Sequence, residues 1–194
     1  MDLTERAAIE ELITKFNQAG DRGPREIVNL VVAHGPKAVP VLTGAVCTSS
    51  LAHIRGWSLI ALSEILGPEG KPHLLMGLKD PQMSVRLRAI QGLVALRHAD
   101  SGKDLLVMLS DPSGGVRVNA IDALVKLKVR GITQQLLPLA TDDKWYVRQH
   151  IARAIGELRL TDALPALHKL RSDDHPAVRK AADRALQLVN LPEV

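Results

Sequence analysis

Five arginines recur at intervals of 31 residues, and each follows an isoleucine or a valine. They are Arg55, Arg86, Arg117, Arg148 and Arg179. A guanidinium group is planar and permanently charged, so such a column could bind the phosphates or carboxylates of a ligand at two points. Four of the arginines, however, come six residues after an aspartate, namely Asp80, Asp111, Asp142 and Asp173. The column therefore has acidic partners within the chain, which favours a structural role over phosphate binding.

Other residues that could do chemistry are scattered along the chain. No two of the seven histidines stand three or four positions apart, which argues against a zinc site on one helix. Gly114 and Gly115 stand alone, without the other elements of a phosphate-binding loop. Cys47 is the only cysteine and follows an apolar run, so we expect an inert, buried thiol. We assign no catalytic residue, no metal ligand and no cofactor.

The same period defines the helices that must position the arginines. We take the residue before each arginine as position zero. Small residues recur four and seven positions later, and larger aliphatic residues recur eight and eleven positions later. In the middle copy these are Ala120, Ala123, Leu124 and Leu127. Such offsets describe one stripe of an α-helix. A leucine column upstream, which includes Leu105, predicts a first helix in each copy.

Each copy is therefore predicted to be a pair of helices that buries its apolar stripes only by stacking on its neighbours. Five such repeats are expected, at 36–66, 70–97, 101–128, 132–159 and 163–190. Residues 1–34 break the register and predict a divergent pair of helices that caps the stack. Its first helix is expected over Leu3–Ala19 with Thr4 as the N-cap, and its second over Arg25–Ala33. We expect a single all-α domain over residues 1–194.

Composition and charge constrain the class and the location of the protein more than its function. The chain has 46% hydrophobic and 24% charged residues, with a net charge of +4 that mixes 25 basic with 21 acidic residues. One cysteine cannot form an internal disulfide, and the polar start of the chain resembles no secretory signal. No apolar run is long enough to cross a membrane as a helix. A cytoplasmic protein without a membrane partner is expected.

The repeated pattern resembles a known class of short helical repeats. The second copy contains Asp80-Pro81, Val85-Arg86, Ala89-Ile90 and Leu93, which follow Leu-Leu-x-x-Leu at 74–78. This pattern is similar to HEAT-like repeats of the phycobilisome-lyase type, and it extends over about residues 36–190. The resemblance implies an α-solenoid, a right-handed superhelix of HEAT-like helix pairs. It also implies that the aspartates and arginines form a ladder between adjacent turns.

In similar repeat proteins one face of the second helices lines the concave side of the superhelix, and we expect partners to bind there. Both tryptophans and the only tyrosine fall on this face. Trp, Tyr, Met and Arg are the residue types that dominate binding hot spots. The candidate partner-binding residues are Trp57, Met83, Leu87, Arg88, Asn119, Asp122, Trp145, Tyr146, Gln149, His150, Arg153 and Arg184. The alternative for Trp57 and Trp145 is that each packs against the adjacent repeat.

Three functions are compatible with this face. The favoured one is a non-enzymatic scaffold or adaptor that binds another protein, as a peptide, a helix or a folded domain. The second is a bilin lyase-like or chromophore-handling role, which the resemblance suggests. The third is DNA binding, because HEAT-like solenoids include alkylation-repair glycosylases. Asp122 and Glu157 interrupt any continuous basic track, which weakens the DNA hypothesis.

Overall fold

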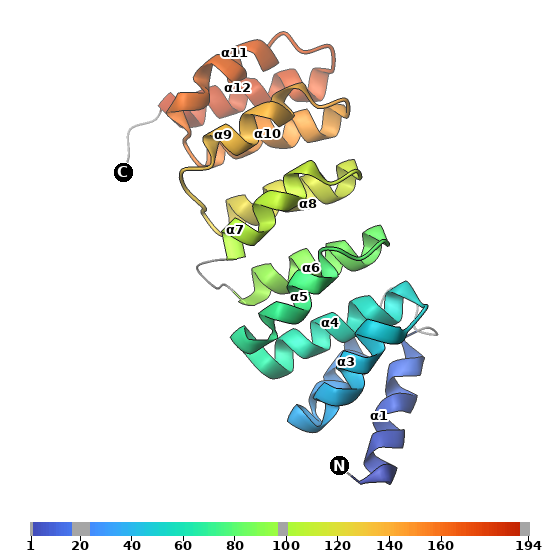
Figure 1. Cartoon of the computed structure of the whole chain (residues 1–194). Coiled ribbons are helices and arrows are strands. Elements are labelled where there is room, and N and C mark those ends of the chain that lie inside the picture. The colour runs from blue at the N-terminus through green and yellow to red at the C-terminus, as the bar shows by residue number, and fades with distance from the viewer. Residues whose placement is uncertain (1, 17–23, 97–100, 191–194) are drawn as a thin grey trace. The chain divides into compact units, whose positions relative to one another are not determined.

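The computed structural model describes residues 2–16, 24–96 and 101–190, and every regular element among them is a helix (Figure 1). The α-helices are α1 (Leu3–Lys15), α2 (Pro24–Val32), α3 (Val39–Thr48), α4 (Ala52–Leu66), α5 (Lys71–Gly77), α6 (Met83–Leu96), α7 (Ser101–Leu106), α8 (Gly114–Lys126), α9 (Thr133–Leu136), α10 (Trp145–Glu157), α11 (Leu164–Leu170) and α12 (Pro176–Asn190). Short 3-10 helices are η1 (Gly35–Ala38), η2 (Gly67–Gly70), η3 (Val107–Ser110), η4 (Leu137–Thr141) and η5 (Thr161–Ala163). The all-α prediction is confirmed over these residues.

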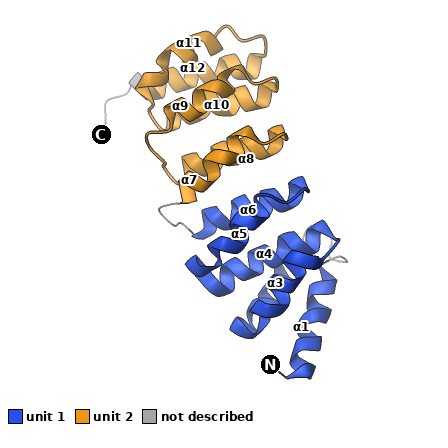
Figure 2. Cartoon of the chain, viewed as in Figure 1, with its two compact units in different colours: residues 1–98 blue, residues 99–194 orange. Residues whose placement is uncertain are grey.

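The chain divides into two compact units, although the sequence predicts one continuous domain. Unit 1 comprises residues 1–98 with α1–α6, and unit 2 comprises residues 99–194 with α7–α12 (Figure 2). Within the units the helices follow one another as pairs, each with a shorter first helix and a longer second helix. The pairs are α3–α4, α5–α6, α7–α8, α9–α10 and α11–α12, and they fall within the five predicted repeats.

The N-terminal pair of helices belongs to unit 1. Helix α1 packs against α2 and α3, and α2 packs against α4. The prediction that Thr4 caps α1 is wrong, because the helix begins at Leu3 and its N-cap is Asp2. The Asp2 carboxylate accepts a hydrogen bond of 3.4 Å from the backbone N–H of Thr4. A carboxylate at this position also interacts favourably with the helix dipole. The predicted continuation of the helix to Ala19 falls partly on residues 17–23, which lie outside the described residues.

The first helices of unit 2 are less regular than the period predicts. Helix α7 ends at Leu106 and continues as η3, and α9 has only four residues before it continues as η4. Pro138 lies in the first turn of η4, where it lacks the N–H that an α-helical hydrogen bond would use. This accounts for the short α9.

The small and large columns of the second helices form the core. Leu124 and Ala120 are fully buried, as predicted. The small residues allow close approach: a Cβ atom added to Gly156 on α10 would lie 2.7 Å from the Cα of Ala185 on α12. A side chain at this position would force these two helices apart.

Helices α8 and α10 end in the same left-handed turn. Lys128 and Arg159, which are 31 positions apart, both have φ of 51°. The next residue after each, Val129 or Leu160, donates its N–H to a carbonyl five positions earlier, at distances of 3.0 Å. This is the Schellman arrangement, in which glycine is the usual residue at the left-handed position. Both helices therefore end with a backbone conformation that costs energy for a residue with a side chain.

Among the described residues, no single helix combines the length and the apolar character needed to cross a membrane. The segments Pro24–Val32 and Gly35–Thr48 meet these criteria only when taken together, and they are bent by 112°.

Candidate functional site

The arginine column forms two kinds of contact within each unit. Arg148 donates from Nε and Nη2 to both carboxylate oxygens of Asp173, at 2.7 and 2.8 Å. Its Nη1 donates to the backbone carbonyl of Asp142, six residues before it. Arg117 pairs in the same way with Asp142, and Arg55 in unit 1 pairs with Asp80. The carboxylate partner therefore comes from the turn 25 residues later, and the aspartate six residues earlier contributes only its carbonyl.

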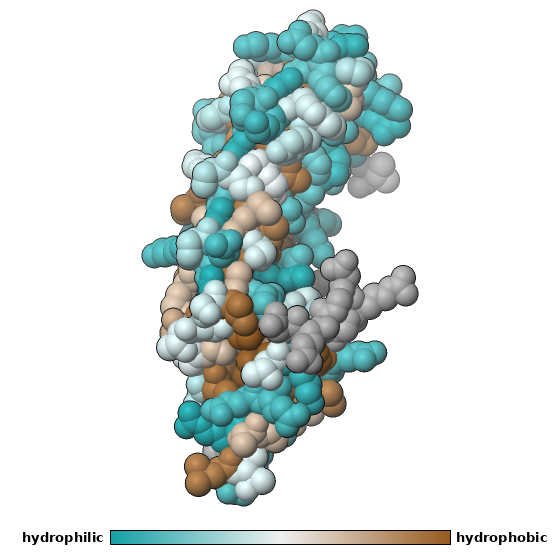
Figure 3. All heavy atoms as spheres, turned by 90° about the vertical axis from the view of Figure 1, so that its right-hand side faces the viewer, coloured by the Kyte–Doolittle hydropathy of each residue, from teal (hydrophilic) through white to brown (hydrophobic). Residues whose placement is uncertain are grey.

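The other two arginines of the column also bind the carbonyl six positions earlier. Arg86 donates to the carbonyl of Asp80, and Arg179 donates to that of Asp173. Three of the five guanidinium groups thus have both their edges engaged by this chain. They are not free to bind a ligand's phosphates. Hydrophilic residues cover most of the face of unit 2 that Figure 3 shows.

The aspartates of the ladder also stabilise the turns that precede the second helices. Asp80, Asp142 and Asp173 each accept a hydrogen bond from the backbone N–H two residues later, at 2.8 to 2.9 Å. The hydrogen bond from Arg148 lowers the pKa of Asp173 more than burial raises it. Burial raises the pKa of Asp80, but the hydrogen bonds from Arg55 and from the N–H of Gln82 outweigh it, so this pKa is also lowered. The carboxylates of Asp80 and Asp173 therefore stay ionised at neutral pH.

In unit 1 the tryptophan of the candidate face is half-buried and packs against other side chains. The ring of Trp57 on α4 stacks on Phe16 with centroids 6.5 Å apart, and the guanidinium of Arg88 on α6 lies 3.8 Å from its centroid. Arg88 also donates to Oε1 of Gln91 at 2.8 Å, and burial lowers its pKa. Trp57 and Arg88, which the sequence places on one face, therefore contact each other and pack together. Met83 is exposed, and Leu87 is half-buried.

In unit 2 the tryptophan lies closer to solvent. Trp145, the first residue of α10, is 41% exposed. It stacks on the imidazole of His175 with centroids 3.9 Å apart and meets Tyr146 edge-to-face at 5.8 Å. The Nδ1 of His175 accepts the N–H of Ala177, so the proton of the neutral ring lies on Nε2. Asn119 is engaged locally, because its amide donates to the carbonyl of Gly115 at 2.9 Å.

A charged cluster joins α8 to α10. The carboxylate of Asp122 on α8 contacts both Nδ1 of His150, at 2.7 Å, and Nη2 of Arg153. Because Nδ1 must carry a proton to donate to the carboxylate, the 3.2 Å approach of Arg153 to the same nitrogen is not a hydrogen bond. Burial raises the pKa of Asp122, but the hydrogen bond and charge of His150, together with Arg153, outweigh it and lower the pKa. The cluster holds Arg153 in place between Asp122 and Glu157, whose carboxylate lies 3.3 Å away.

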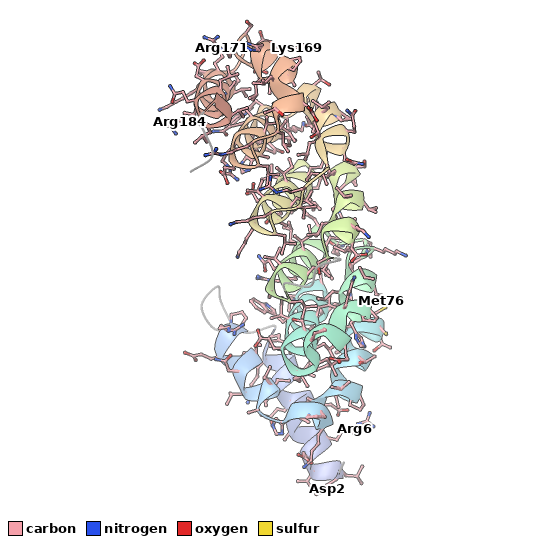
Figure 4. All side chains as sticks on the ribbon, turned by 90° about the vertical axis from the view of Figure 1, so that its left-hand side faces the viewer. Asp2, Arg6, Met76, Lys169, Arg171 and Arg184 are labelled. Carbon is pink, nitrogen blue, oxygen red and sulfur yellow. The ribbon has the colours of Figure 1, made fainter. Side chains whose placement is uncertain are left out.

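A groove of about 550 Å³ lies between α10 and α12. Its lining residues are Gln149, His150, Arg153, Glu157, Ala177, Lys180, Ala181, Arg184, Ala185 and Leu188. Lys180 and Arg184 are exposed, and no carboxylate among the described residues pairs with either of them. Leu188 is 39% exposed, one helical turn beyond Arg184. Figure 4 shows Arg184 projecting from the side of this helix pair that faces away from Lys169.

The structure thus brings together part of the predicted site. Gln149, His150, Arg153 and Arg184 line one groove. Trp145 lies one turn before Gln149, and its stacking partner His175 comes two residues before Ala177. Asp122, Asn119 and Tyr146 do not line the groove; Asp122 supports it through His150 and Arg153.

Two further features considered in the sequence are metal ligands and the single cysteine. Among the described residues, no group of three His, Cys, Asp or Glu side chains is placed to hold a metal ion. The expectation that Cys47 is buried is wrong, because this residue near the end of α3 is exposed. The apolar run predicted a buried position, but the packing stripe of α3 passes through Leu42 and Val46 and leaves Cys47 outside it.

Comparison with known proteins shows what fold this is. A family model for HEAT repeats matches residues 133–194. The match covers α9 to α12, and together with the solved structures described below it shows a HEAT-like repeat fold. A designed armadillo repeat protein in complex with the peptide (KR)4 has a TM-score of 0.59 and 17% identity, over 94% of this chain and 99% of that one. No curated protein matches the sequence.

Two natural proteins share the fold of this HEAT-like protein. The complex of CpcE and CpcF of phycocyanin lyase from Nostoc sp. PCC7120 has a TM-score of 0.53 and 18% identity, over 93% of this chain and 76% of that chain. Human deoxyhypusine hydroxylase in complex with glycerol has a TM-score of 0.55 and 19% identity, over 94% of this chain and 74% of that one. At these identities the likeness shows the fold and does not transfer an activity.

Two residues at the site, Leu188 and His175, were not predicted from the sequence. Leu188 falls ten positions after position zero of its repeat, on the predicted face, but it was assigned no role. His175 precedes the first residue of α12, where the column analysis does not reach. The signal for His175 is its place after Asp173, because the residue two after each ladder aspartate donates its N–H to that carboxylate and lies at the start of the second helix.

Proposed function

We propose that the chain is a non-enzymatic protein-binding module and that the groove between α10 and α12 holds a segment of its partner. The observation that carries the proposal is the character of this groove. It has two exposed cations that form no ion pair with any described residue, an exposed leucine at one end, and an exposed tryptophan one turn before its other end. Exposed apolar side chains outside the core are typical of binding surfaces.

The fold supports a protein or peptide as the kind of partner. The second helices of the repeats present neighbouring columns of side chains, so a chain lying across α10 and α12 meets residues from both. The designed armadillo repeat protein with a similar fold is in complex with a peptide, (KR)4. A groove of about 550 Å³ is within the range of pockets that hold small ligands or short peptide segments.

A selection from random peptides tests this function without knowledge of the partner. Short random peptides displayed on phage are selected against the whole chain. The affinity of the selected peptides is then measured for the wild type, for Leu188→Ala and for Met76→Ala. Met76 is exposed to a similar degree, at 42%, but it lies on α5 in unit 1, so its variant is the matched control.

The expected result is that Leu188→Ala weakens the selected peptides about tenfold, because an apolar anchor is worth roughly 1–2 kcal/mol at a binding hot spot. Met76→Ala should leave their affinity unchanged. The proposal fails if no peptide is selected, or if the selected peptides bind both variants as tightly as the wild type.

A further inference from the structure

The free charge of the groove lies on one wall. Lys180 and Arg184 are four residues apart on α12, so they occupy adjacent turns of the same helix face. Neither forms an ion pair within the described residues. Like charges at this spacing repel each other and weaken a helix slightly. A carboxylate placed between them would relieve that repulsion.

The charges on the opposite wall are already balanced. Arg153 on α10 is held by Asp122 and Glu157, and His150 is held by Asp122. Among the ionisable residues that line the groove, the lysine and arginines number three and the carboxylates one. The groove is therefore net positive, and its uncompensated charge is confined to Lys180 and Arg184.

The spacing along α12 defines the pattern that a ligand must match. Lys180, Arg184 and Leu188 follow one another at intervals of four residues, which is about 6 Å per step along a helix. In an extended peptide, side chains on one face repeat every two residues, or about 6.7 Å. An extended segment with acidic, acidic and apolar residues at alternate positions thus matches these three side chains.

A helical ligand is the alternative, because side chains four positions apart on a helix also repeat about every 6 Å. It would need nine residues to reach all three side chains, whereas an extended segment reaches them with five. The extended segment is favoured because fewer residues must be ordered on binding.

From these observations we infer that the groove selects an extended, acidic peptide segment with carboxylates at alternate positions followed by an apolar residue. The inference rests on the proposed peptide-binding function and names the class of partner. A protein segment is favoured over a nucleic acid because Leu188 offers an apolar contact that a phosphate backbone does not use.

Fluorescence anisotropy with labelled peptides tests the inference. The probe peptide has the core Glu-Ser-Glu-Ser-Leu, and its counterparts carry Gln or Lys in place of both Glu residues. A short DNA duplex is a fourth probe. The proteins are the wild-type chain, the double variant Lys180→Glu/Arg184→Glu, Lys169→Glu and Leu188→Ala. Lys169 is an exposed lysine on α11, outside the groove, so its variant controls for a lysine-to-glutamate charge reversal elsewhere in unit 2.

The wild type and Lys169→Glu should bind the Glu peptide at least about tenfold more tightly than the Gln or Lys peptide. The double variant should lose the Glu peptide and gain the Lys peptide, a reversal that misfolding cannot produce. Equal binding of the Glu and Gln peptides, with both lost on Leu188→Ala, would overturn the acidic preference but leave the peptide-binding function standing. Binding of no peptide would overturn both. Binding of the duplex alone, lost in the double variant, would replace the peptide with a nucleic acid.

Discussion

The two tryptophans of this chain both lie on the predicted face, one in each unit, yet their surroundings differ. Trp57 in unit 1 is half-buried and contacts Phe16 and the guanidinium of Arg88. Trp145 in unit 2 has one stacking partner, His175, and keeps 41% of its surface exposed. The N-terminal helix α1, with Phe16 at its end, covers the first ring, and no added helix among the described residues covers the second. The predicted face is thus used for packing in one unit and left accessible in the other.

The exposure of Trp145 points to a binding surface only if the core of unit 2 beneath this ring is well packed. Leu124 is fully buried on α8. Leu124→Ala should reduce the free energy of unfolding by about 2–5 kcal/mol, because it removes buried methyl groups and leaves a cavity. Chemical denaturation followed by circular dichroism measures this loss. A loss well under 1 kcal/mol would show that unit 2 is loosely packed and that the exposure of Trp145 reflects this rather than a binding surface.

The tryptophans themselves give the sharpest contrast. Trp57→Ala should cost about 2–4 kcal/mol of stability, because it removes the ring that packs on Phe16 and Arg88. Trp145→Ala should cost about 1 kcal/mol, the value of its stacking with His175. Thermal unfolding of the two variants, measured side by side, checks the difference. Equal losses would remove the distinction between the packed and the accessible ring.

A double variant at Trp145 and Arg153 tests whether the accessible face of unit 2 also binds a ligand. The double variant Trp145→Ala/Arg153→Ala should weaken peptides that bind the groove by tenfold or more, with a change in stability of about 1–2 kcal/mol. Isothermal titration calorimetry with a selected peptide measures the first effect. A large loss of stability with unchanged affinity would return both residues to the structural core.

The ladder should respond to acid in the same way in both units. The pKa of Asp173 is lowered in the folded state, so its contribution to stability is present above its unfolded pKa of 3.8 and is lost as the pH falls below about 4. Asp173→Asn should cost about 1–3 kcal/mol at pH 7, because it breaks a two-point ion pair with Arg148. The variant should also lose less stability than the wild type between pH 5 and about pH 3. Parallel acid unfolding curves for the two proteins would contradict this role.

The smallest expected effect is an increase in stability. Lys128 ends α8 with φ of 51°, a conformation that glycine adopts without steric cost. Lys128→Gly should stabilise the chain by up to about 1 kcal/mol, and the larger unfolded-state entropy of glycine reduces the gain. Gly131→Ala, at φ of 73°, is the reverse change in the same turn region and should destabilise. A loss of stability in Lys128→Gly would show that the left-handed turn is not strained.

Much of the fold follows from the sequence because the period is exact and each column has one role. The recurrence of leucine and alanine columns at 31 residues is enough to place the second helices and to identify Leu124 as core. The carboxylate partner of each ladder arginine was harder to predict from the sequence. The nearest aspartate in sequence supplies a carbonyl, and the carboxylate comes from the next turn, a choice that depends on how the repeats stack.

The site was predicted only in part, because exposure depends on neighbours that the repeat pattern does not specify. The columns place Trp57 and Trp145 on one face, but only the position of Phe16 determines that Trp57 is covered. In the same way, Lys180 and Arg184 are free only because the acidic residues nearby are engaged elsewhere, as Asp183 is by Arg171. Pairings of this kind are set by three-dimensional contacts and leave no periodic signal.

Hydrogen–deuterium exchange of the chain with and without a saturating, selected peptide tests the central claim most directly. A peptide that lies in the groove should slow exchange in α10 and α12 and leave α4 and α6, which carry Trp57 and Arg88, unchanged. Protection of α4 and α6 without any change in α10 and α12 would show that the accessible surface of unit 2 is not where the partner binds.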